Sequence, residues 1–173
     1  MLLQTNRLTI RRVVEADWVP IKEIWVDFNA SDFSQYDMPH NTDDDDVRKR
    51  ISKWASVSDS TEHMFFAICL GDTVIGYSAF NIHGDGHEVG YCFHSAYHGK
   101  GYAKESHVAL LDYLSSLGMT KFTAGTAINN VPSVSLLKSL GFKLVGTEKV
   151  SFYKDAHGNN IVFDGGIFEL TTA

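Results

Sequence analysis

The most informative residues lie between Glu88 and Ala103, where an apolar run is followed by a glycine-rich stretch and then by a helical pattern. A loop that contains Gly99 and Gly101 and opens a helix leaves several backbone N–H groups pointing outward together. The positive end of the helix dipole adds to their attraction for a phosphate. Lys100 brings a cation to the same loop. The segment therefore predicts a pyrophosphate site, with a plain strand-to-helix connection as the alternative.

Two common phosphate-binding motifs do not match this loop. A Walker A loop needs four residues between its glycines and then Lys-Ser or Lys-Thr, whereas one residue separates Gly99 from Gly101. A Rossmann fingerprint needs a third glycine at the position of Lys104. Coenzyme A remains as the familiar ligand to consider.

Four segments, in this order along nearly the whole chain, resemble the GNAT superfamily of N-acetyltransferases. The resemblance is greatest to the branch of ribosomal-protein N-terminal acetyltransferases. The segments are Thr5-Asn-Arg-Leu-Thr-Ile-Arg11, Glu88-Val-Gly-Tyr91, His98-Gly-Lys-Gly-Tyr-Ala103, and Asn130-Val-Pro-Ser133 followed by Leu136-Leu-Lys-Ser-Leu-Gly-Phe142. The resemblance implies an α/β fold: a central mixed, splayed β-sheet of about seven strands with helices on both faces.

The same resemblance implies acetyl-CoA as cosubstrate, held in a cleft where two parallel strands splay. The backbone of Tyr91, Cys92 and Phe93 would bond the pantetheine arm, and one of these amides would stabilise the oxyanion. His98 stands where the motif usually has Gln or Arg, and its imidazole can still donate to a phosphate oxygen. Asn130 would contact the pantetheine arm or cap its helix. The amides expected to hold the pyrophosphate are those of Gly99, Lys100, Gly101, Tyr102 and Ala103.

Direct attack of an amine on the thioester requires a base and a way to stabilise the leaving thiolate. Glu88 begins the strand that would line the cleft, so we expect it to act as general base, directly or through water. The alternative is an exposed glutamate at a strand end. Many members of the superfamily place a Tyr where Leu137 stands, whereas the branch resembled here has a Ser at Ser133. We therefore expect Ser133 to bond the sulfur or relay a proton.

The resemblance favours the N-terminal α-amine of a protein or peptide as the acceptor. Fold does not fix the substrate, so a small amine such as a polyamine or an aminoglycoside is the first alternative. A non-catalytic module that binds acyl-CoA is the second. The Leu at position 137 and the His at position 98 keep that second alternative open.

Periodicity predicts the elements that position these residues. Alternation of apolar and polar residues predicts strands, and spacing by three and four predicts helices. Thr42 and Asp45 resemble a capping box at the start of the second helix. A helix between two strands gives parallel neighbours, so the sheet should be mixed. The expected strands are 8–12, 64–70, 73–82, 88–94, 121–127, 142–146, 149–153 and 160–170, with helices from 15, from 42 to about 54, from 103 to 117 and from 130 to 140.

Length and charge restrict the class of protein. The 173 residues predict a single domain, 1–173, since domains mostly run to roughly 100–200 residues. The 15 Lys and Arg against 21 Asp and Glu give a net charge of −6, which argues against nucleic acid as a partner. The chain is expected to be a monomer or a homodimer.

Cysteine usage and apolar runs indicate the compartment. Cys69 and Cys92 each lie in an apolar run, which is typical of a reducing compartment. No stretch is long and apolar enough for a signal peptide or for a membrane span of about 20 residues, so we expect a cytoplasmic protein without a membrane partner. His83, His87, His94 and Cys92 lack zinc spacing, so no metal is expected.

Overall fold

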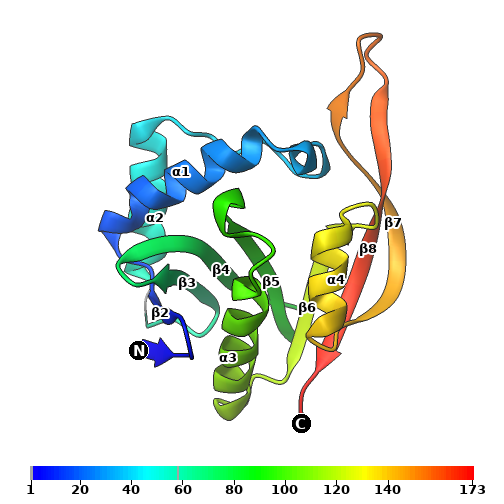
Figure 1. The fold of residues 1–173 in the computed structure, drawn as a ribbon. Helices are drawn as coiled ribbons and strands as arrows, with labels where there is room; N and C mark the ends of the chain where they lie inside the picture. Colours follow the sequence, from blue (N-terminus) through cyan, green and yellow to red (C-terminus); the bar gives the residue numbers. More distant parts are fainter. Residues whose placement is uncertain (1, 58) are drawn as a thin grey trace.

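The computed structural model describes residues 2–57 and 59–173 (Figure 1). Three short 3₁₀ turns are labelled η. The elements in chain order are β1 (Leu2–Gln4), β2 (Thr9–Arg12), η1 (Glu15–Asp17), α1 (Trp18–Asn29), η2 (Asp32–Tyr36), α2 (Asp44–Ser56), β3 (His63–Leu70), β4 (Thr73–His83), β5 (Gly86–Phe93), η3 (Ser95–Tyr97), α3 (Tyr102–Ser116), β6 (Lys121–Ala127), α4 (Val131–Ser139), β7 (Lys143–Lys154) and β8 (Asn160–Thr171).

The strands of the described residues form one sheet in the order β1-β2-β3-β4-β5-β6-β8-β7. All neighbouring strands run antiparallel except β5 and β6, which run parallel and are connected through α3. The mixed sheet is therefore confirmed, with eight strands where about seven were expected. Residues 2–4 add a short edge strand, and the two runs expected at 142–146 and 149–153 are one strand, β7, with two irregularities in its register.

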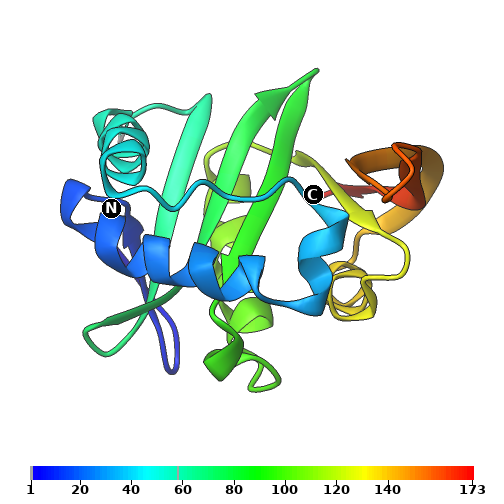
Figure 2. The ribbon, with the colours of Figure 1, turned by 90° about the horizontal axis from the view of Figure 1, so that it is seen from above.

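Helices cover both faces of the sheet, as expected (Figures 1 and 2). Helices α1 and α2 pack through a cluster that includes Trp25, Ile51 and Tyr77. Helices α3 and α4 cover the opposite face, where Phe80 packs edge-on against Phe66 and Phe122. Figure 2 shows α1 and the chain between η2 and α2 at the same end of the sheet. The two clusters give each face of the sheet its own apolar layer, which fixes the strands between them.

The ends of the helices follow local rules, with one correction. The N-cap of α2 is Asp43, whose carboxylate accepts from the amides of Asp45 and Asp46 at 3.0 and 3.2 Å. The capping box expected at Thr42 is therefore wrong, because Asp43 supplies the acceptor one residue later. Asn130 is the N-cap of α4, as its position indicated.

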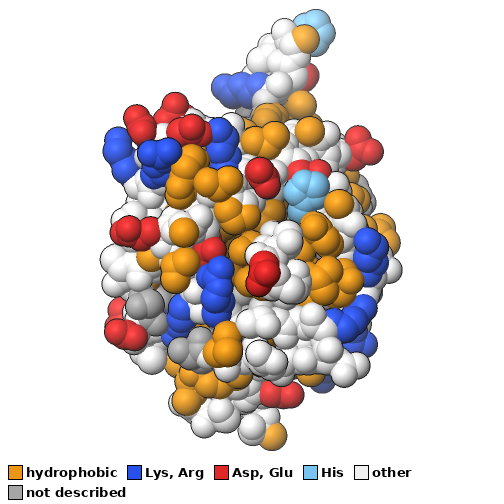
Figure 3. Space-filling view, turned by 60° about the vertical axis from the view of Figure 1, so that its left-hand side comes forward, with side chains coloured by type: hydrophobic (Ala, Val, Ile, Leu, Met, Phe, Trp, Pro, Cys, Tyr) orange, Lys and Arg blue, Asp and Glu red, His pale blue; other side chains and the backbone are white. Residues whose placement is uncertain are grey.

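Strands β7 and β8 form a long hairpin whose tip projects beyond the rest of the molecule (Figure 3). The Asp155 carboxylate orders the turn by accepting from the amides of His157 and Asn159 at 2.8 and 2.9 Å. Nearer the body, the Tyr153 hydroxyl donates to the carbonyl of Ser34 in η2 at 3.1 Å. Within the residues described, no helix is both long and apolar enough to cross a bilayer.

Candidate functional site

The parallel strands β5 and β6 separate soon after they begin. Their register contains only two pairs, His87 with Phe122 and Glu88 with Thr123. Beyond Glu88, β5 remains paired with β4, while β6 is paired with β8 along its whole length. The splay expected between two parallel strands is thus present, and Glu88 and Thr123 are the last pair before it.

Along β5, the backbone N–H and C=O groups of successive residues point alternately toward β4 and toward the splay. The amide of His94 donates to the carbonyl of Ile75, near the start of β4, at 3.0 Å. In an antiparallel ladder the bonding residues alternate, so the backbone groups of Cys92 also face β4. Those of Tyr91 and Phe93 face the splay. Of the three residues expected to meet the pantetheine arm, two therefore present their backbone there and Cys92 does not.

Cys92 turns its side chain toward the helices instead. It packs against the apolar cluster beneath α1 and α2, and burial raises the pKa of its thiol to about 12. Both Cys69 and Cys92 are free thiols. Cys92 is thus a small, neutral packing residue at the pH of a cell.

The loop before α3 has the geometry of an anion site. Gly99 and Gly101 have φ of +71° and +80°, a left-handed conformation that side chains with a Cβ rarely adopt. Gly101 is the N-cap of α3 and offers no capping side chain. Among the described residues, the amides of residues 99–103 have no acceptor. Five consecutive donors are therefore free at the positive end of a helix, which suits a pyrophosphate.

The two basic side chains of the loop are directed to neighbouring carbonyl groups. Lys100 donates from Nζ to the carbonyl of Ala96 at 3.0 Å. His98 donates from Nε2 to the carbonyl of Phe93 at 2.8 Å, which ties the loop to the end of β5. His98 therefore keeps only Nδ1 for another partner, and the carbonyl of Phe93 already has one.

Residues near the N-terminus hold this loop from below, a feature that the sequence did not predict. Arg7 donates from Nε and from its backbone amide to the two oxygens of Glu105, at 2.7 and 2.9 Å. The Thr5 hydroxyl donates to the same carboxylate at 2.6 Å, and Arg7 Nη1 donates to the carbonyl of Lys100 at 2.9 Å. Burial raises the pKa of Glu105, but the hydrogen bonds from Thr5 and Arg7 outweigh it and lower the pKa overall.

Glu88 lies on the opposite face of the sheet from α3 and α4. Its neighbours Val89 and Tyr91 pack into the core beneath those helices, so the alternation of the strand directs Glu88 to the other face. Glu88 is exposed there and is the partner of Asn81 on β4 and Thr123 on β6.

Two glycines leave space beside Glu88. Gly90 and Gly125 each lie two residues beyond the pair formed by Glu88 and Thr123, so they share the face of Glu88. A Cβ added to either glycine would have no heavy atom within 4 Å. Beyond the pair of Glu88 and Thr123, the sheet therefore offers only backbone at these two positions of this face.

The first turn of α4 meets β5 through a pair of hydroxyl groups. The side chain of Asn130 accepts from the amide of Ser133 at 3.3 Å, which is the capping role expected as one alternative for Asn130. The Ser133 hydroxyl lies 2.7 Å from the Tyr91 hydroxyl. Burial raises the pKa of Tyr91, and its hydrogen bond to Ser133 opposes that rise. The structure thus brings together Tyr91 and Ser133, which the sequence had given separate roles.

A buried histidine on α3 supports Tyr91 and was missed by the sequence analysis. His107 meets the Tyr91 ring edge-on, with centroids 4.9 Å apart. Its Nδ1–H donates to the carbonyl of Ala103 at 2.7 Å, so Nε2 accepts from the Ser78 hydroxyl at 2.9 Å. Burial lowers the pKa of His107 to about 4, and the ring is neutral at pH 7. The one sign of its burial in the sequence is that position 107 falls on the apolar face of α3.

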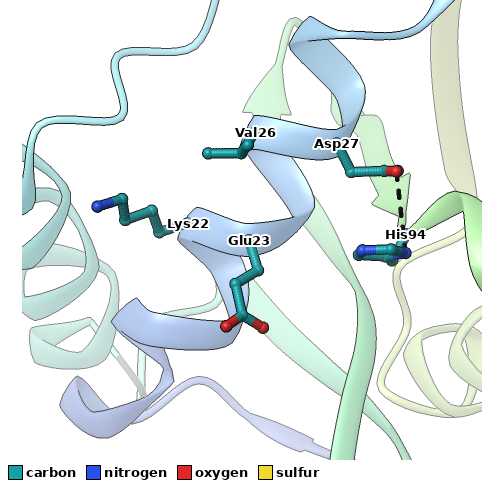
Figure 4. Close-up of a pocket in the computed structure, with 5 residues that line it drawn as sticks. All are labelled: Lys22, Glu23, Val26, Asp27 and His94. Carbon is teal, nitrogen blue, oxygen red and sulfur yellow. Dashed lines mark ion pairs between the residues drawn. The ribbon is translucent and has the colours of Figure 1, made fainter.

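A solvent-exposed hollow lies at the junction of α1 with the segment after β5 (Figure 4). Asp27 accepts from the amide and the hydroxyl of Ser95, at 2.8 and 2.6 Å, and so joins α1 to the turn before the glycine loop. His94 Nδ1 lies 4.0 Å from Asp27, the contact dashed in Figure 4. The hollow contains none of the residues expected to bind substrate; its lining residues are Lys22, Glu23, Val26, Asp27 and His94.

Across residues 2–57 and 59–173, no three His, Cys, Asp or Glu side chains gather closely enough to hold a metal ion. His87, one of the histidines considered for such a site, instead has its Nε2 2.8 Å from the carbonyl of Thr61.

Comparison with known proteins places this geometry in a family. Residues 7–143 match the profile of the acetyltransferase (GNAT) domain. The chain is 30% identical over 150 residues to the "Uncharacterized N-acetyltransferase p20" of Bacillus licheniformis, a match that covers 83% of each chain.

Solved structures with 16–17% identity share the fold. One is an acetyltransferase from Salmonella typhimurium that "modifies N-terminal serine of 50S ribosomal subunit protein L7/L12", with a TM-score of 0.85, 16% identity and 100% of each chain covered. Another is the ribosomal L7/L12 α-N-protein acetyltransferase RimL in complex with coenzyme A, with a TM-score of 0.84, 17% identity, and 99% of this chain and 98% of that chain covered.

Proposed function

We propose that this chain, which belongs to the GNAT acetyltransferase family, acetylates the N-terminal α-amine of a protein or peptide. Membership of the family makes it an acetyl-CoA-dependent N-acetyltransferase. The acceptor and the roles of individual residues are proposals that rest on the geometry of the splay.

The glycine loop binds the pyrophosphate of acetyl-CoA through the amides of residues 99–103. The supporting observation is that these amides have no acceptor in the described residues and lie at the start of α3. The backbone of Tyr91 and Phe93 borders the pantetheine arm, and an amide of this edge stabilises the oxyanion of the tetrahedral intermediate. Cys92, which lies between them, makes no contact with the pantetheine arm. Holding the thioester and the amine together supplies much of the acceleration.

Glu88 acts as the general base for the acceptor amine, directly or through water. Its exposed carboxylate is at the last strand pair before the splay, where a base can reach a proton on an incoming nitrogen. Gly90 and Gly125 leave room beside it for the amine and the acetyl carbonyl. Ser133, on the other face, donates a hydrogen bond to the leaving sulfur.

The exposure of Glu88 is the observation that carries the choice of acceptor. The base lies on the side of the sheet that α1 and α2 cover elsewhere, and solvent reaches its carboxylate. The end of a polypeptide can reach such a base while the rest of the chain remains outside. Two structural neighbours that act on ribosomal protein L7/L12 share this fold over 99–100% of the chain, which is consistent with the same class of acceptor.

A panel of acceptors tests the proposal. Acetyl-CoA is incubated with peptides that begin with Ser, Ala or Met, with the same peptides blocked at the α-amine, and with polyamines and aminoglycosides. Free thiol and the mass of the acceptor are measured. We expect thiol release with free peptides and none with blocked ones. Turnover only with a small amine would assign that acceptor instead, and binding of acetyl-CoA without any transfer would favour a non-catalytic module.

We also propose that residues 1–173 act as one domain in the cytoplasm. A single sheet that contains both β1 and β8 supports one domain, and two free cysteines suit a reducing compartment. Sedimentation analysis distinguishes a monomer from a homodimer.

A further inference from the structure

We propose that Tyr91 is a positioning residue that directs the hydroxyl hydrogen of Ser133 toward the sulfur of the leaving thiolate. This inference rests on the proposed function, since it assigns a residue to the same acetyl transfer. Its basis is the 2.7 Å contact between the Tyr91 and Ser133 hydroxyl oxygens, on the face of the sheet that α3 and α4 cover.

The hydroxyl groups of Tyr91 and Ser133 have two hydrogens between them, and one of these is not used in the bond that joins the two groups. Each hydroxyl has one hydrogen to donate, and the contact between them uses one. Among the described residues neither oxygen has another side-chain or backbone partner. If Tyr91 donates, the hydrogen of Ser133 is free to point elsewhere; if Ser133 donates, the free hydrogen belongs to Tyr91.

The surroundings decide which hydroxyl donates. The Tyr91 side chain packs against the apolar core beneath α3 and α4, where a hydroxyl hydrogen without an acceptor is unfavourable. Burial also raises the pKa of Tyr91, so the phenol keeps its proton and remains a donor. Ser133 and Tyr91 are both half-buried, but a phenol is a much stronger acid than an alcohol and is therefore the stronger hydrogen-bond donor. Tyr91 therefore donates to Ser133, and the hydrogen of Ser133 is free to face the ligand.

His107 holds the phenol in this orientation. Its ring packs edge-on against Tyr91 and is itself fixed by bonds to Ala103 and Ser78. Helix α4 has no tyrosine of its own at position 137, where many members of the superfamily have one. The residue there is Leu137, which is buried in the core with 1% of its surface exposed. The aromatic hydroxyl near α4 thus comes from strand β5.

The chemical step requires no phenolate. The amine nitrogen forms a bond to the acetyl carbon, and the bond from carbon to sulfur breaks with its electron pair on sulfur. The amine loses its proton to Glu88 and then to solvent. Ser133 donates a hydrogen bond to the sulfur as negative charge develops, Tyr91 donates to Ser133, and the free thiolate takes a proton from water.

A double-mutant cycle with Tyr91→Phe, Ser133→Ala and the double variant tests this inference. Thiol release is measured with the acceptor found for the wild-type enzyme. Since a hydrogen bond to a charged group contributes more than one between neutral groups, we expect kcat to fall roughly 10-fold in each single variant. We expect KM for acetyl-CoA to change little. In the Ser133→Ala background, Tyr91→Phe should have no further effect.

Tyr113→Phe is the matched control, because it removes a phenol from α3 that has no hydrogen-bond partner in the described residues. Its kcat should equal that of the wild type. Full activity of Tyr91→Phe, or an equal loss with and without Ser133, would overturn the role of Tyr91 while the acetyltransferase function stands. A folded wild-type protein that acetylates no amine would overturn both.

Discussion

Arg7 and Glu105, 98 residues apart in the sequence, are joined next to the glycine loop by two hydrogen bonds, one to each carboxylate oxygen of Glu105. Arg7 also donates to the carbonyl of Lys100 and covers the Tyr102 ring at 4.5 Å. The connection between β1 and β2 thus fixes both the loop and the first turn of α3, which present the free amides. This contact gives the loop a fixed shape before a ligand arrives, and preorganisation of this kind raises affinity.

Replacing Glu105 by Gln should weaken acetyl-CoA binding. The Arg7 side chain is 43% exposed, so solvent screens the pair, and we expect the dissociation constant to rise only about 5-fold. Isothermal titration with acetyl-CoA measures it. Lys149→Ala removes an exposed ion pair with Asp164 on the projecting hairpin and serves as control. Equal affinities in the wild type and Glu105→Gln would show that the loop keeps its shape without the contact.

Replacing Glu88 by Gln should lower turnover without affecting acetyl-CoA affinity. General bases contribute roughly 100-fold to 10,000-fold, and we expect a loss of at least about 10-fold in kcat. Glu169→Gln is the matched control, since Glu169 of β8 pairs with Thr123 of β6 and is exposed on the same face as Glu88. Equal losses in the two variants would mean that the carboxylates attract the amine by their charge and that neither is the base.

Gly90→Ala and Gly125→Ala should lower turnover without lowering stability. Neither glycine has a positive φ, and a Cβ would meet no atom within 4 Å, so the fold accepts both changes. Gly→Ala at compatible sites stabilises by about 0.4–1 kcal/mol. The added methyl group occupies the space beside Glu88, so we expect turnover to fall while Tm does not.

Gly146→Ala is the control for these variants, because it adds a methyl group to β7, where it would make an ordinary contact with Ile167 at 3.7 Å. Thermal unfolding and thiol release are measured on all three proteins. Unchanged turnover in both Gly90→Ala and Gly125→Ala would remove the acceptor from this part of the sheet.

The features that the sequence predicts are those fixed by neighbours in the chain. Gly99 and Gly101 adopt left-handed conformations and α3 begins directly after them, so the phosphate loop follows from local geometry. The order of strands and helices predicts that β5 and β6 run parallel, whereas the splay between them was expected from the family resemblance. The three-residue strand Leu2–Gln4 is too short for alternation to reveal it.

The contacts that refine the site depend on tertiary packing. The hydroxyl groups of Tyr91 and Ser133 meet only when α4 packs against β5, and no periodicity marks such a pair. The direction of the Cys92 backbone depends on the register between β4 and β5. A side chain without periodic neighbours, such as Arg7, gives no signal of a partner 98 residues away.

His107 should make the free energy of unfolding depend on pH. Its pKa is about 4 in the folded protein against 6.5 for an ordinary histidine, because burial disfavours the charged ring. The unfolded chain therefore binds more protons between these values. The contribution of His107 is complete above about pH 6.5 and is lost as the pH falls through 4. It amounts to roughly 3 kcal/mol, since one pKa unit corresponds to about 1.4 kcal/mol.

Urea unfolding of the wild type and His107→Gln at about pH 7 and pH 4.5 measures this contribution. The carboxylates titrate in both proteins, so the difference between their pH dependences isolates the histidine. We expect the wild type to lose more stability on acidification than His107→Gln, whereas His157→Gln, in the exposed hairpin turn, should behave as the wild type. Parallel pH dependences in wild type and His107→Gln would mean that the ring accepts a proton inside the folded core, and Tyr91 would then pack against a cation.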